Sequence, residues 1–333
     1  MANEQQCAEL HDKELVREAR VLEKQLAKGF AQMAVDFPRL VDGRSLDEYA
    51  WATMTVASRA FGRRLPFAAL VPLADLLNHA SVQTKYVLED GVFRLFPTAK
   101  YRPKRGQEAF NSYGRIPNRE LVLHYGFALP DNPWDFVRIN LAVGDSVPNA
   151  PRKRELCALS GLPSPWDLFA IPVPPEPLVR FFRVVALSLD EIEAVKKHPR
   201  GPGNAIAQIV SLDNEVKALQ AAAQSVQALL SPLPTREKDD AQQLAALGNA
   251  HSRLRSALLY RIGRKRITRF CLQYLRTLGG IVQRMVEYEL SLKQAAALYP
   301  KAQAVVLKAV FNADNFASEA GFDQGAMLDE LGL

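Results

Sequence analysis

The stretch between Val71 and Phe127 places two polar clusters on apolar segments and joins them through a strand-like region. The first cluster, Asn78-His79, ends a run of apolar residues. Pro72 suits the first turn of a short helix, which we expect to carry residues 75–78. An amide, an imidazole and the unpaired backbone groups of a helix end can together hold a polar ligand. Taken alone, the same residues also fit a capping asparagine beside an ordinary half-buried histidine.

A β-hairpin is predicted between the two clusters. Residues 86–96 are typical of a strand, an Asp-Gly turn and a second strand, and Asp-Gly between apolar strand segments is the strongest short-range hairpin signal. We expect a third strand over residues 109–113 and, after a turn, a helix capped by Asn118. Taken alone, Tyr113 is typical of an aromatic residue that packs on a sheet.

The chain begins with predicted helices. Residues 9–35 are expected to form one amphipathic helix, because leucines recur among charged residues. Ser45 begins a second, largely buried helix, and Glu48 is placed to complete a capping box. Near the end of this helix, Arg59 taken alone is typical of a solvated or capping arginine.

Four motifs follow one another, and the ordered set is far more specific than any of its members. They are PLADLLNH at 72–79, GQEAFNSYG at 106–114, NRELVLHYGF at 118–127 and NPWD at 132–135. The set resembles the C-terminal half of the SET domain in the Rubisco large-subunit methyltransferase-like family, which includes the actin-histidine methyltransferase. The likeness continues through residues 211–217 and 252–267 and extends over residues 14–278.

The resemblance implies an α+β fold. A partial SET domain of short strands and helices would be followed by an all-helical C-terminal domain, similar to the Rubisco LSMT substrate-binding domain. The implied domains are a helical remnant of the SET insertion at 1–61, the C-terminal part of the SET domain at 62–130, the helical substrate-binding domain at 131–290 and a helical extension at 291–333. The family's N-terminal SET lobe, with its Gly-x-Gly turn, has no recognisable counterpart in the sequence.

The same resemblance implies S-adenosyl-L-methionine as the cofactor and Tyr113 as the catalytic tyrosine. The residues implied to bind the cofactor are Arg59, Asp75, Leu76, Leu77, Asn78, His79, Tyr125, Gly126 and Phe127. Asn78 and His79 are expected closest to it, and the last three residues are expected to form a wall beside the adenine. No metal is expected.

The implied function is protein-lysine N-methylation of a non-histone protein by direct displacement. The target amine attacks the sulfonium methyl group in line, so it must be neutral, whereas the pKa of free lysine is about 10.4. A dry channel that lowers this pKa, and alignment of the amine with the methyl group, would supply most of the acceleration. Histidine is an open alternative target, because the family methylates both residues.

Two other functions stay open. A catalytically deficient SET relative, or a truncated gene product, could act as a protein-binding module, which the absent lobe favours. A helical scaffold that binds nucleic acid is the third hypothesis, because Arg and Lys are dense between Arg253 and Arg269. No aromatic residues interleave on the side that Arg253, Arg261 and Arg264 share. A solvated basic helix, or a groove for an acidic protein, is therefore favoured over a nucleic-acid surface.

Length, charge and cysteine content limit the number of domains and the cellular compartments that fit this chain. A chain of 333 residues with a net charge of +6 predicts two domains and only a modest positive field. Three distant cysteines form no metal-ligand pattern and indicate a reducing compartment. No apolar run is long enough to cross a membrane, and no secretory signal is recognisable. We expect a monomer in the cytoplasm or nucleus, with the chloroplast as the alternative.

Helices are expected to dominate after residue 132, where strand signals end. The predicted helices span 178–189, 189–197, 205–230, 240–278, 281–292 and 294–316, with a short piece from 322. The first four are expected to end before Gly279-Gly280. Gly201-Pro202-Gly203 is predicted to be a linker.

Overall fold

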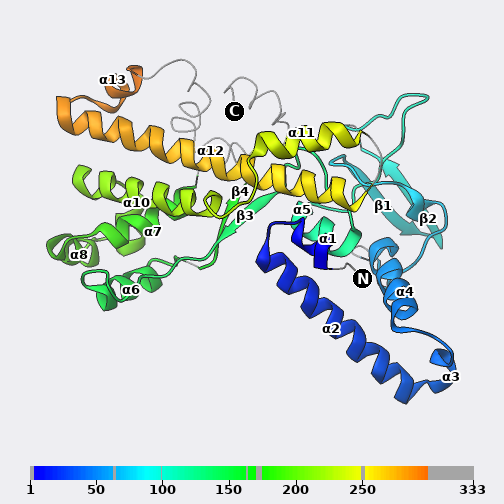
Figure 1. Cartoon of the computed structure of the whole chain (residues 1–333). Helices are drawn as coiled ribbons and strands as arrows, with labels where there is room; N and C mark the ends of the chain where they lie inside the picture. Colours follow the sequence, from blue (N-terminus) through cyan, green and yellow to red (C-terminus); the bar gives the residue numbers. More distant parts are fainter. Residues whose placement is uncertain are drawn as a thin grey trace. The chain divides into compact units, whose positions relative to one another are not determined.

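The computed structural model describes residues 4–62, 65–98, 100–162, 164–169, 175–248 and 252–298. The chain divides into two compact units, drawn in Figure 1. Unit 1 holds residues 1–134 and 238–262, and unit 2 holds residues 135–237 and 263–333. Both units combine helices with a two-stranded sheet, which confirms the predicted α+β class. The four predicted domain ranges stay predictions.

Unit 1 begins with two helices where one was predicted. Helix α1 (Glu4–Ala8) and helix α2 (Lys13–Asp36) are separated by His11, whose φ of 50° lies in the left-handed region. Asp12 then takes an extended conformation, and its carboxylate accepts the backbone N–H groups of Glu14 and Leu15 at 3.0 and 3.1 Å. The prediction of a continuous helix over 9–35 was wrong because the leucine pattern runs through this N-cap.

The second predicted helix is confirmed. After the short helix α3 (Pro38–Val41), helix α4 (Leu46–Arg59) starts with a complete capping box between Ser45 and Glu48. Helix α4 packs on α2. The rings of Phe30 and Tyr49 lie 5.5 Å apart at this contact.

The predicted hairpin is also confirmed. Strands β1 (Thr84–Glu89) and β2 (Val92–Pro97) pair antiparallel around Asp90-Gly91. Both turn residues have positive φ, 53° and 73°, as this turn requires. Phe61, just after α4, holds the inner face of the hairpin through edge-on contacts to Tyr86 and Phe93, with centroids 5.2 and 5.0 Å away.

The segments around this hairpin differ from the prediction. The helix near Asp75 is a single 3-10 turn, η1 (Ala74–Leu76). The predicted strand over 109–113 is reduced to an isolated parallel bridge between His79 and Asn111. Asn118 lies inside the short helix α5 (Asn118–Glu120) instead of capping it. Its amide donates to and accepts from the backbone of Leu129, at 2.9 and 2.8 Å.

The chain returns to unit 1 through helix α11 (Glu237–Leu247) and the first turns of the long helix α12 (Arg253–Tyr288). Tyr260 donates its hydroxyl to Asp12 at 2.6 Å. The Arg261 side chain, 3% exposed, pairs with Asp240 and Glu9. The expectation of a solvated basic helix is therefore wrong at Arg261, whose charge is neutralised within the unit.

Within its described residues, unit 2 combines helices with one hairpin that the sequence did not predict. Strands β3 (Phe136–Ile139) and β4 (Trp166–Phe169) pair antiparallel. The helices that the structure describes here are α6 (Ala150–Leu159), α7 (Glu176–Ala186), α8 (Leu189–Lys196), α9 (Pro202–Ala207), α10 (Leu212–Leu230), the later part of α12 and α13 (Leu292–Ala297). The predicted helical character is confirmed, and the description "all-helical" is corrected by β3 and β4.

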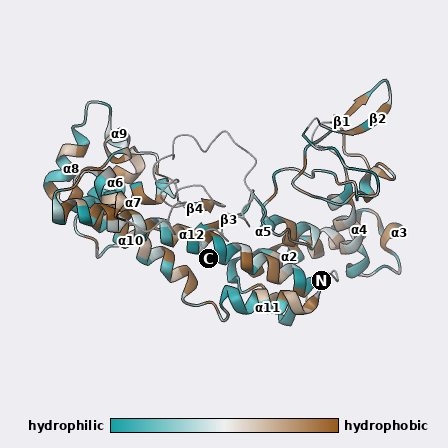
Figure 2. Ribbon diagram, turned by 90° about the horizontal axis from the view of Figure 1, so that it is seen from above, coloured by the Kyte–Doolittle hydropathy of each residue, from teal (hydrophilic) through white to brown (hydrophobic). Residues whose placement is uncertain are grey.

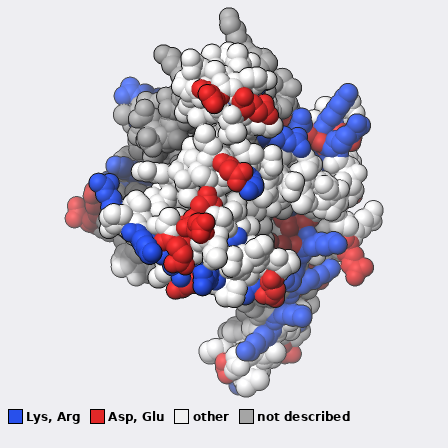
Figure 3. Space-filling view, turned by 90° about the vertical axis from the view of Figure 1, so that its left-hand side faces the viewer, with Lys and Arg blue, Asp and Glu red and all other residues white. Residues whose placement is uncertain are grey.

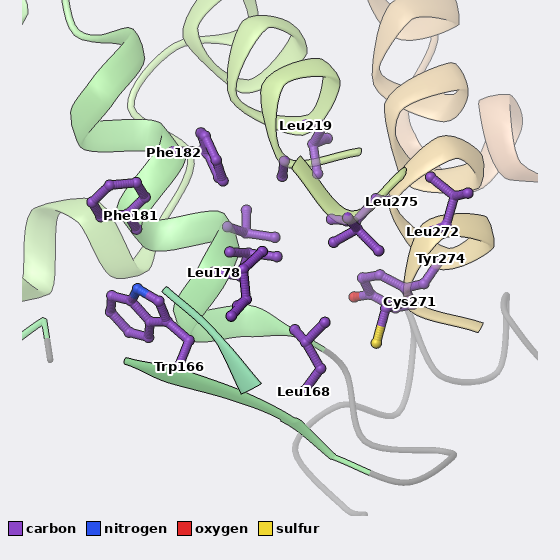
Figure 4. Packing of buried hydrophobic residues seen from close by; sticks show 14 of the residues in the cluster. Trp166, Leu168, Leu178, Phe181, Phe182, Leu219, Cys271, Leu272, Tyr274 and Leu275 are labelled. Carbon is purple, nitrogen blue, oxygen red and sulfur yellow. The ribbon is translucent and has the colours of Figure 1, made fainter. Parts of the chain in front are cut away.

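The core of unit 2 lies between this hairpin and helices α7, α10 and α12, as Figure 4 shows. Trp166 and Leu168 enter it from β4, Leu178 from α7, and Leu219 and Leu275 from α10 and α12. Both colours of the hydropathy scale occur around the helices in Figure 2, as amphipathic helices require.

Two predictions of helix ends in unit 2 that were based on glycines were wrong. Gly279-Gly280 does not end α12, which continues to Tyr288. A Cβ at Gly279 would lie 3.6 Å from that of Leu219, which is an ordinary van der Waals distance, so this part of α12 packs directly on α10. Gly201-Pro202-Gly203 begins α9 instead of forming a linker, and 205–230 is split between α9 and α10.

Two further statements apply to the described residues. Among them, no helix is both long and apolar enough to cross a membrane. The predicted helix over 294–316 is represented only by α13, and the rest of it, with the piece from 322, lies outside the described residues.

Candidate functional site

His79 and Tyr113 form the centre of the candidate site in unit 1. Their rings stack with centroids 4.9 Å apart and planes inclined by 17°. The Tyr113 backbone N–H donates to His79 Nδ1 at 3.1 Å, and the Asn111 carbonyl oxygen lies 3.3 Å from the same nitrogen. Because a backbone N–H can only donate, we assign the acceptor role to Nδ1 and the ring proton to Nε2. Burial lowers the pKa of His79, and the nearby Asn111 carbonyl raises it by a smaller amount. The imidazole is therefore neutral near pH 7.

His79 Nε2 is buried and has no hydrogen-bond partner among the described residues. The residue as a whole is only 5% exposed. A buried N–H without an acceptor is costly, so this position would gain from a ligand atom that accepts the proton.

The Tyr113 hydroxyl is held by the turn that carries the first sequence motif. It donates to the carbonyl of Leu77, the residue that ends η1, at 2.8 Å. This bond fixes the phenol and satisfies a carbonyl that the short turn leaves unpaired. Burial raises the pKa of Tyr113 above its usual 10.0, although Arg59 acts in the opposite direction. The hydroxyl therefore keeps its proton at neutral pH.

Two further aromatic rings, those of Tyr125 and Phe127, lie next to Tyr113 and His79. The Tyr125 ring lies 5.5 Å from that of Tyr113, and the Phe127 ring lies 6.2 Å from Tyr125 and 6.3 Å from His79. Tyr125 ends the π-helical turn η2 (Leu121–Tyr125), a geometry that is frequent at functional sites. Gly126 then reverses the chain with a φ of 78°, which only glycine adopts without strain.

A polar cavity of about 170 Å³ opens beside these rings. The predicted residues Arg59, Asp75, Tyr113 and Tyr125 line it. The Arg59 guanidinium donates to the Asp75 carbonyl oxygen at 2.9 Å, which ties the end of α4 to η1. A cation, a carboxylate and two phenols around one cavity suit a ligand that carries charges of both signs.

A larger cavity of about 620 Å³ lies alongside, also within unit 1. Helices α2 and α4, the turn η2 and the first turns of α12 line it mainly with apolar side chains. Ser58, Arg59 and Tyr125 border both cavities, so the two are neighbours. The volume is within the range of about 300–1,000 Å³ that is common for small-molecule sites.

Several predicted residues lie off the polar cavity. Leu76 is 64% exposed. Asn78 is also exposed, and its side-chain amide donates to Glu108 Oε1 at 2.7 Å. Its carbonyl accepts the Asn111 N–H at 2.8 Å, so Asn78 joins the two motif segments through the backbone.

The sequence analysis missed four polar residues that line the same cavity: Ser58, Tyr86, Asn111 and Ser112. Thr84 links two of them, because its hydroxyl donates to Asn111 Oδ1 at 2.8 Å and accepts the Ser112 N–H at 2.9 Å. The GQEAFNSYG motif contains Asn111 and Ser112, and this membership was the available signal. No comparable signal marked Tyr86.

The described residues contain no cluster of three or more His, Cys, Asp or Glu side chains that could hold a metal ion.

Comparison with known proteins identifies the second unit first. Residues 144–267 match the family model described as Rubisco LSMT substrate-binding. This range covers all of α6 to α11 and the beginning of α12, so it includes residues 238–262 of unit 1 as well as part of unit 2.

The chain is also similar to actin-histidine N-methyltransferases. It is 30% identical to the protein of Callithrix jacchus over 249 residues, and 32% identical to that of Gallus gallus over 248 residues. Each match covers 68% of this chain and 40% of the relative. The matched region thus spans about two fifths of these relatives' length.

Solved structures of Rubisco LSMT share the fold. The structure bound to sinefungin and monomethyllysine aligns with a TM-score of 0.61 and 23% identity, covering 99% of this chain and 74% of that one. The SET domain of LSMT bound to lysine and AdoHcy aligns with a TM-score of 0.60 and 21% identity, covering 100% and 74%. The chain is therefore similar in sequence to the actin-histidine N-methyltransferases and in fold to Rubisco LSMT, and its residues 144–267 match the Rubisco LSMT substrate-binding family model.

Proposed function

We propose that this protein is an S-adenosylmethionine-dependent protein N-methyltransferase whose target is a lysine of a non-histone protein. Histidine is the variant target, because the similar curated proteins are named actin-histidine N-methyltransferases. One observation carries the proposal most directly. The Tyr113 hydroxyl is fixed by Leu77 and stacked on a neutral His79, next to a cavity that holds Arg59 and Asp75.

The residues present fit such a cofactor in three respects. Tyr125 and Phe127 offer aromatic faces on which a purine can stack. The buried His79 Nε2 lacks an acceptor among the described residues and could donate to a ring nitrogen or a carboxylate. The polar cavity alone, at about 170 Å³, would hold only one end of the molecule, and the neighbouring apolar cavity offers space for more.

The chemistry assigned to this chain's residues is positioning. When bound, the cofactor would supply an electrophilic methyl group. Tyr113 stays protonated, so its oxygen can accept a hydrogen bond from an attacking amine while its proton is held by Leu77. The surrounding rings exclude water, which favours the neutral and nucleophilic form of the amine. Alignment by a fixed phenol then lowers the barrier without a covalent intermediate on the protein.

Transfer of a labelled methyl group tests the proposal. The purified chain is incubated with methyl-labelled S-adenosylmethionine and a protein extract, and labelled bands are compared between variants. Tyr113→Phe should reduce labelling about hundredfold, as expected when one positioning group at a reacting centre is lost. Tyr49→Phe, which removes a phenol that packs on Phe30 away from the cavity, should label like the wild type. Equal labelling by wild type and Tyr113→Phe would contradict the role of Tyr113.

A protein-binding module without catalysis is the second candidate. The match of residues 144–267 to a substrate-binding family model supports it, because that range includes none of the residues that line the polar cavity. The two candidates separate on cofactor binding. A folded chain that captures a protein but takes up no S-adenosylmethionine would favour the module.

A further inference from the structure

A short loop after the hairpin of unit 1 carries four cations in six residues. We call it the cationic loop: Lys100, Arg102, Lys104 and Arg105, between Lys100 and Arg105. All four side chains are exposed. Within the described part of the chain, none of them has an ion-pair partner. This distinguishes the loop from the basic run of α12, where Arg261 is neutralised by Asp240 and Glu9.

Hydrogen bonds hold the cationic loop in place. The Tyr101 hydroxyl accepts the Phe110 N–H at 2.7 Å, and the Tyr101 N–H donates to the Thr98 carbonyl at 3.0 Å. The Lys104 carbonyl accepts the Gln107 N–H at 3.0 Å, and the Gln107 side chain accepts the Lys104 N–H at 3.0 Å. The cations therefore project from a fixed turn, which lowers the entropy lost when a partner binds.

The hydrogen bond between Tyr101 and Phe110 places the cationic loop near the candidate site. Phe110, which Tyr101 holds, precedes Tyr113 by three residues. Their Cα atoms are therefore at most about 11 Å apart. Asn111, next to Phe110, pairs with the backbone of Asn78 and bridges to His79. A polypeptide with its target residue at Tyr113 can reach the loop with a few flanking residues.

Charges on another face of the molecule are mixed. On the face drawn in Figure 3, Lys and Arg side chains are interspersed with Asp and Glu, as on an ordinary solvated surface. The cationic loop has Glu108 as its nearest acidic residue in sequence, and that carboxylate accepts a hydrogen bond from Asn78. Its charges are thus left for an external partner.

We propose that the cationic loop binds an acidic segment of the protein substrate, next to the residue that is methylated. This inference rests on the proposed function and adds a substrate class to it. A peptide is favoured over a nucleic acid, because single-stranded nucleic acids need exposed aromatic platforms. Tyr101 is the single aromatic residue of the loop, and its hydroxyl is engaged by Phe110.

Peptide binding tests the inference without any need for catalysis. The probe is a fluorescent peptide with one lysine flanked by glutamates, and its uncharged counterpart has serines in their place. Binding to the full chain is measured by fluorescence anisotropy. The loop variant is Arg102→Gln/Lys104→Gln/Arg105→Gln. The matched control, Lys13→Gln/Lys24→Gln/Lys28→Gln, removes three exposed cations of α2 and changes the net charge equally.

The glutamate peptide should bind the wild type and the control alike, and the loop variant about tenfold more weakly, from three exposed charge contacts. The difference should shrink at higher salt, because exposed charges are screened. Equal losses in both variants, or no measurable binding of the glutamate peptide to the wild type, would overturn the inference. Tighter binding of a single-stranded oligothymidylate, lost only in the loop variant, would assign the loop to nucleic acid instead.

Titration of the loop variant with S-adenosylmethionine separates this inference from the proposed function. The heat of binding should equal that of the wild type, because the loop does not line either cavity. If no variant binds the cofactor while the peptide result is as expected, the methyltransferase proposal fails and the docking surface stands.

Discussion

The core of unit 2 is built from apolar side chains, whereas the candidate site of unit 1 is held by polar contacts to the backbone. Phe270 and Leu275 are fully buried among helices α7, α10 and α12. In unit 1, the site depends on the hydrogen bonds from Tyr113 to Leu77 and His79. The apolar core of unit 2 is expected to resist local unfolding. The site of unit 1, which is held by a few hydrogen bonds, is expected to adjust more readily to a ligand.

Leucine side chains also differ in exposure between the core of unit 2 and the site of unit 1. Leu275 of unit 2 is fully buried, while Leu73 and Leu76 beside the site are 78% and 64% exposed. Leu73 has a φ of 73°, a costly conformation for a residue with a side chain. We therefore expect substitutions in the core of unit 2 to reduce stability more than substitutions beside the site of unit 1. Four predictions test this contrast.

The largest effect is expected at the buried ion pair of unit 2. Glu215 accepts two hydrogen bonds from Arg183, at 2.5 and 2.8 Å, and both side chains are nearly inaccessible to water. Glu215→Gln leaves a buried guanidinium uncompensated and should destabilise unit 2 by about 3 to 5 kcal/mol. Hydrogen exchange measured by mass spectrometry would localise the loss. Glu193→Gln, which breaks the exposed pair with Arg152, should cost about 1 kcal/mol at most.

Truncation of leucines tests the contrast in packing. Leu275→Ala should destabilise unit 2 by about 2 to 5 kcal/mol, because it creates a cavity in the core. Leu76→Ala in η1 should change unfolding by less than about 0.5 kcal/mol, because its side chain is mostly in water. Hydrogen exchange would measure both changes in the free energy of unfolding. Similar values for the two variants would contradict the proposed difference in packing between the units.

A smaller effect is expected where polar contacts hold unit 1 together. Asp12 caps α2 and accepts the hydroxyl of Tyr260 at 2.6 Å. Asp12→Ala should destabilise unit 1 by about 1 to 2 kcal/mol, through the lost cap and the lost hydrogen bond to the buried Tyr260 hydroxyl. Asp12→Asn keeps an acceptor for the cap and should lose less. Protection of the amides of α2 against exchange is the measurement.

The smallest effect concerns the pH dependence of unit 1. Burial lowers the pKa of His79 below 6.5, so the unfolded chain binds a proton before the folded chain does. Stability should therefore fall as the pH drops below about 6.5, and the loss should continue until the folded-state pKa is reached. His79→Gln should weaken this dependence, measured as the thermal midpoint between pH 5 and pH 7 in about half-unit steps. An identical dependence in the variant would show that other groups cause it.

The sequence correctly predicted structures that depend on interactions between neighbouring residues. The Asp-Gly pair of the hairpin and the Ser45–Glu48 capping box both formed as expected, because each depends on residues within a few positions. Long-range packing explains the failures. Gly279 lies within α12 and packs against Leu219 of α10, which is far away in the sequence.

The candidate site follows the same division. The motifs identified Tyr113, His79 and Tyr125, and the structure brings these three rings together. Tyr86 enters the cavity from β1, and no local pattern could assign it there. The neutralisation of Arg261 was equally invisible, because Glu9 and Asp240 approach it from distant segments.

Calorimetric titration of the chain with S-adenosylmethionine tests the central claim most directly, that the site of unit 1 holds this cofactor beside Tyr113. The account predicts measurable binding that Tyr113→Phe largely spares, because the hydroxyl serves the attacking amine. Tyr125→Ala should weaken binding about tenfold through the loss of an aromatic face. No heat of binding from a folded chain, or equal binding by wild type and Tyr125→Ala, would contradict it.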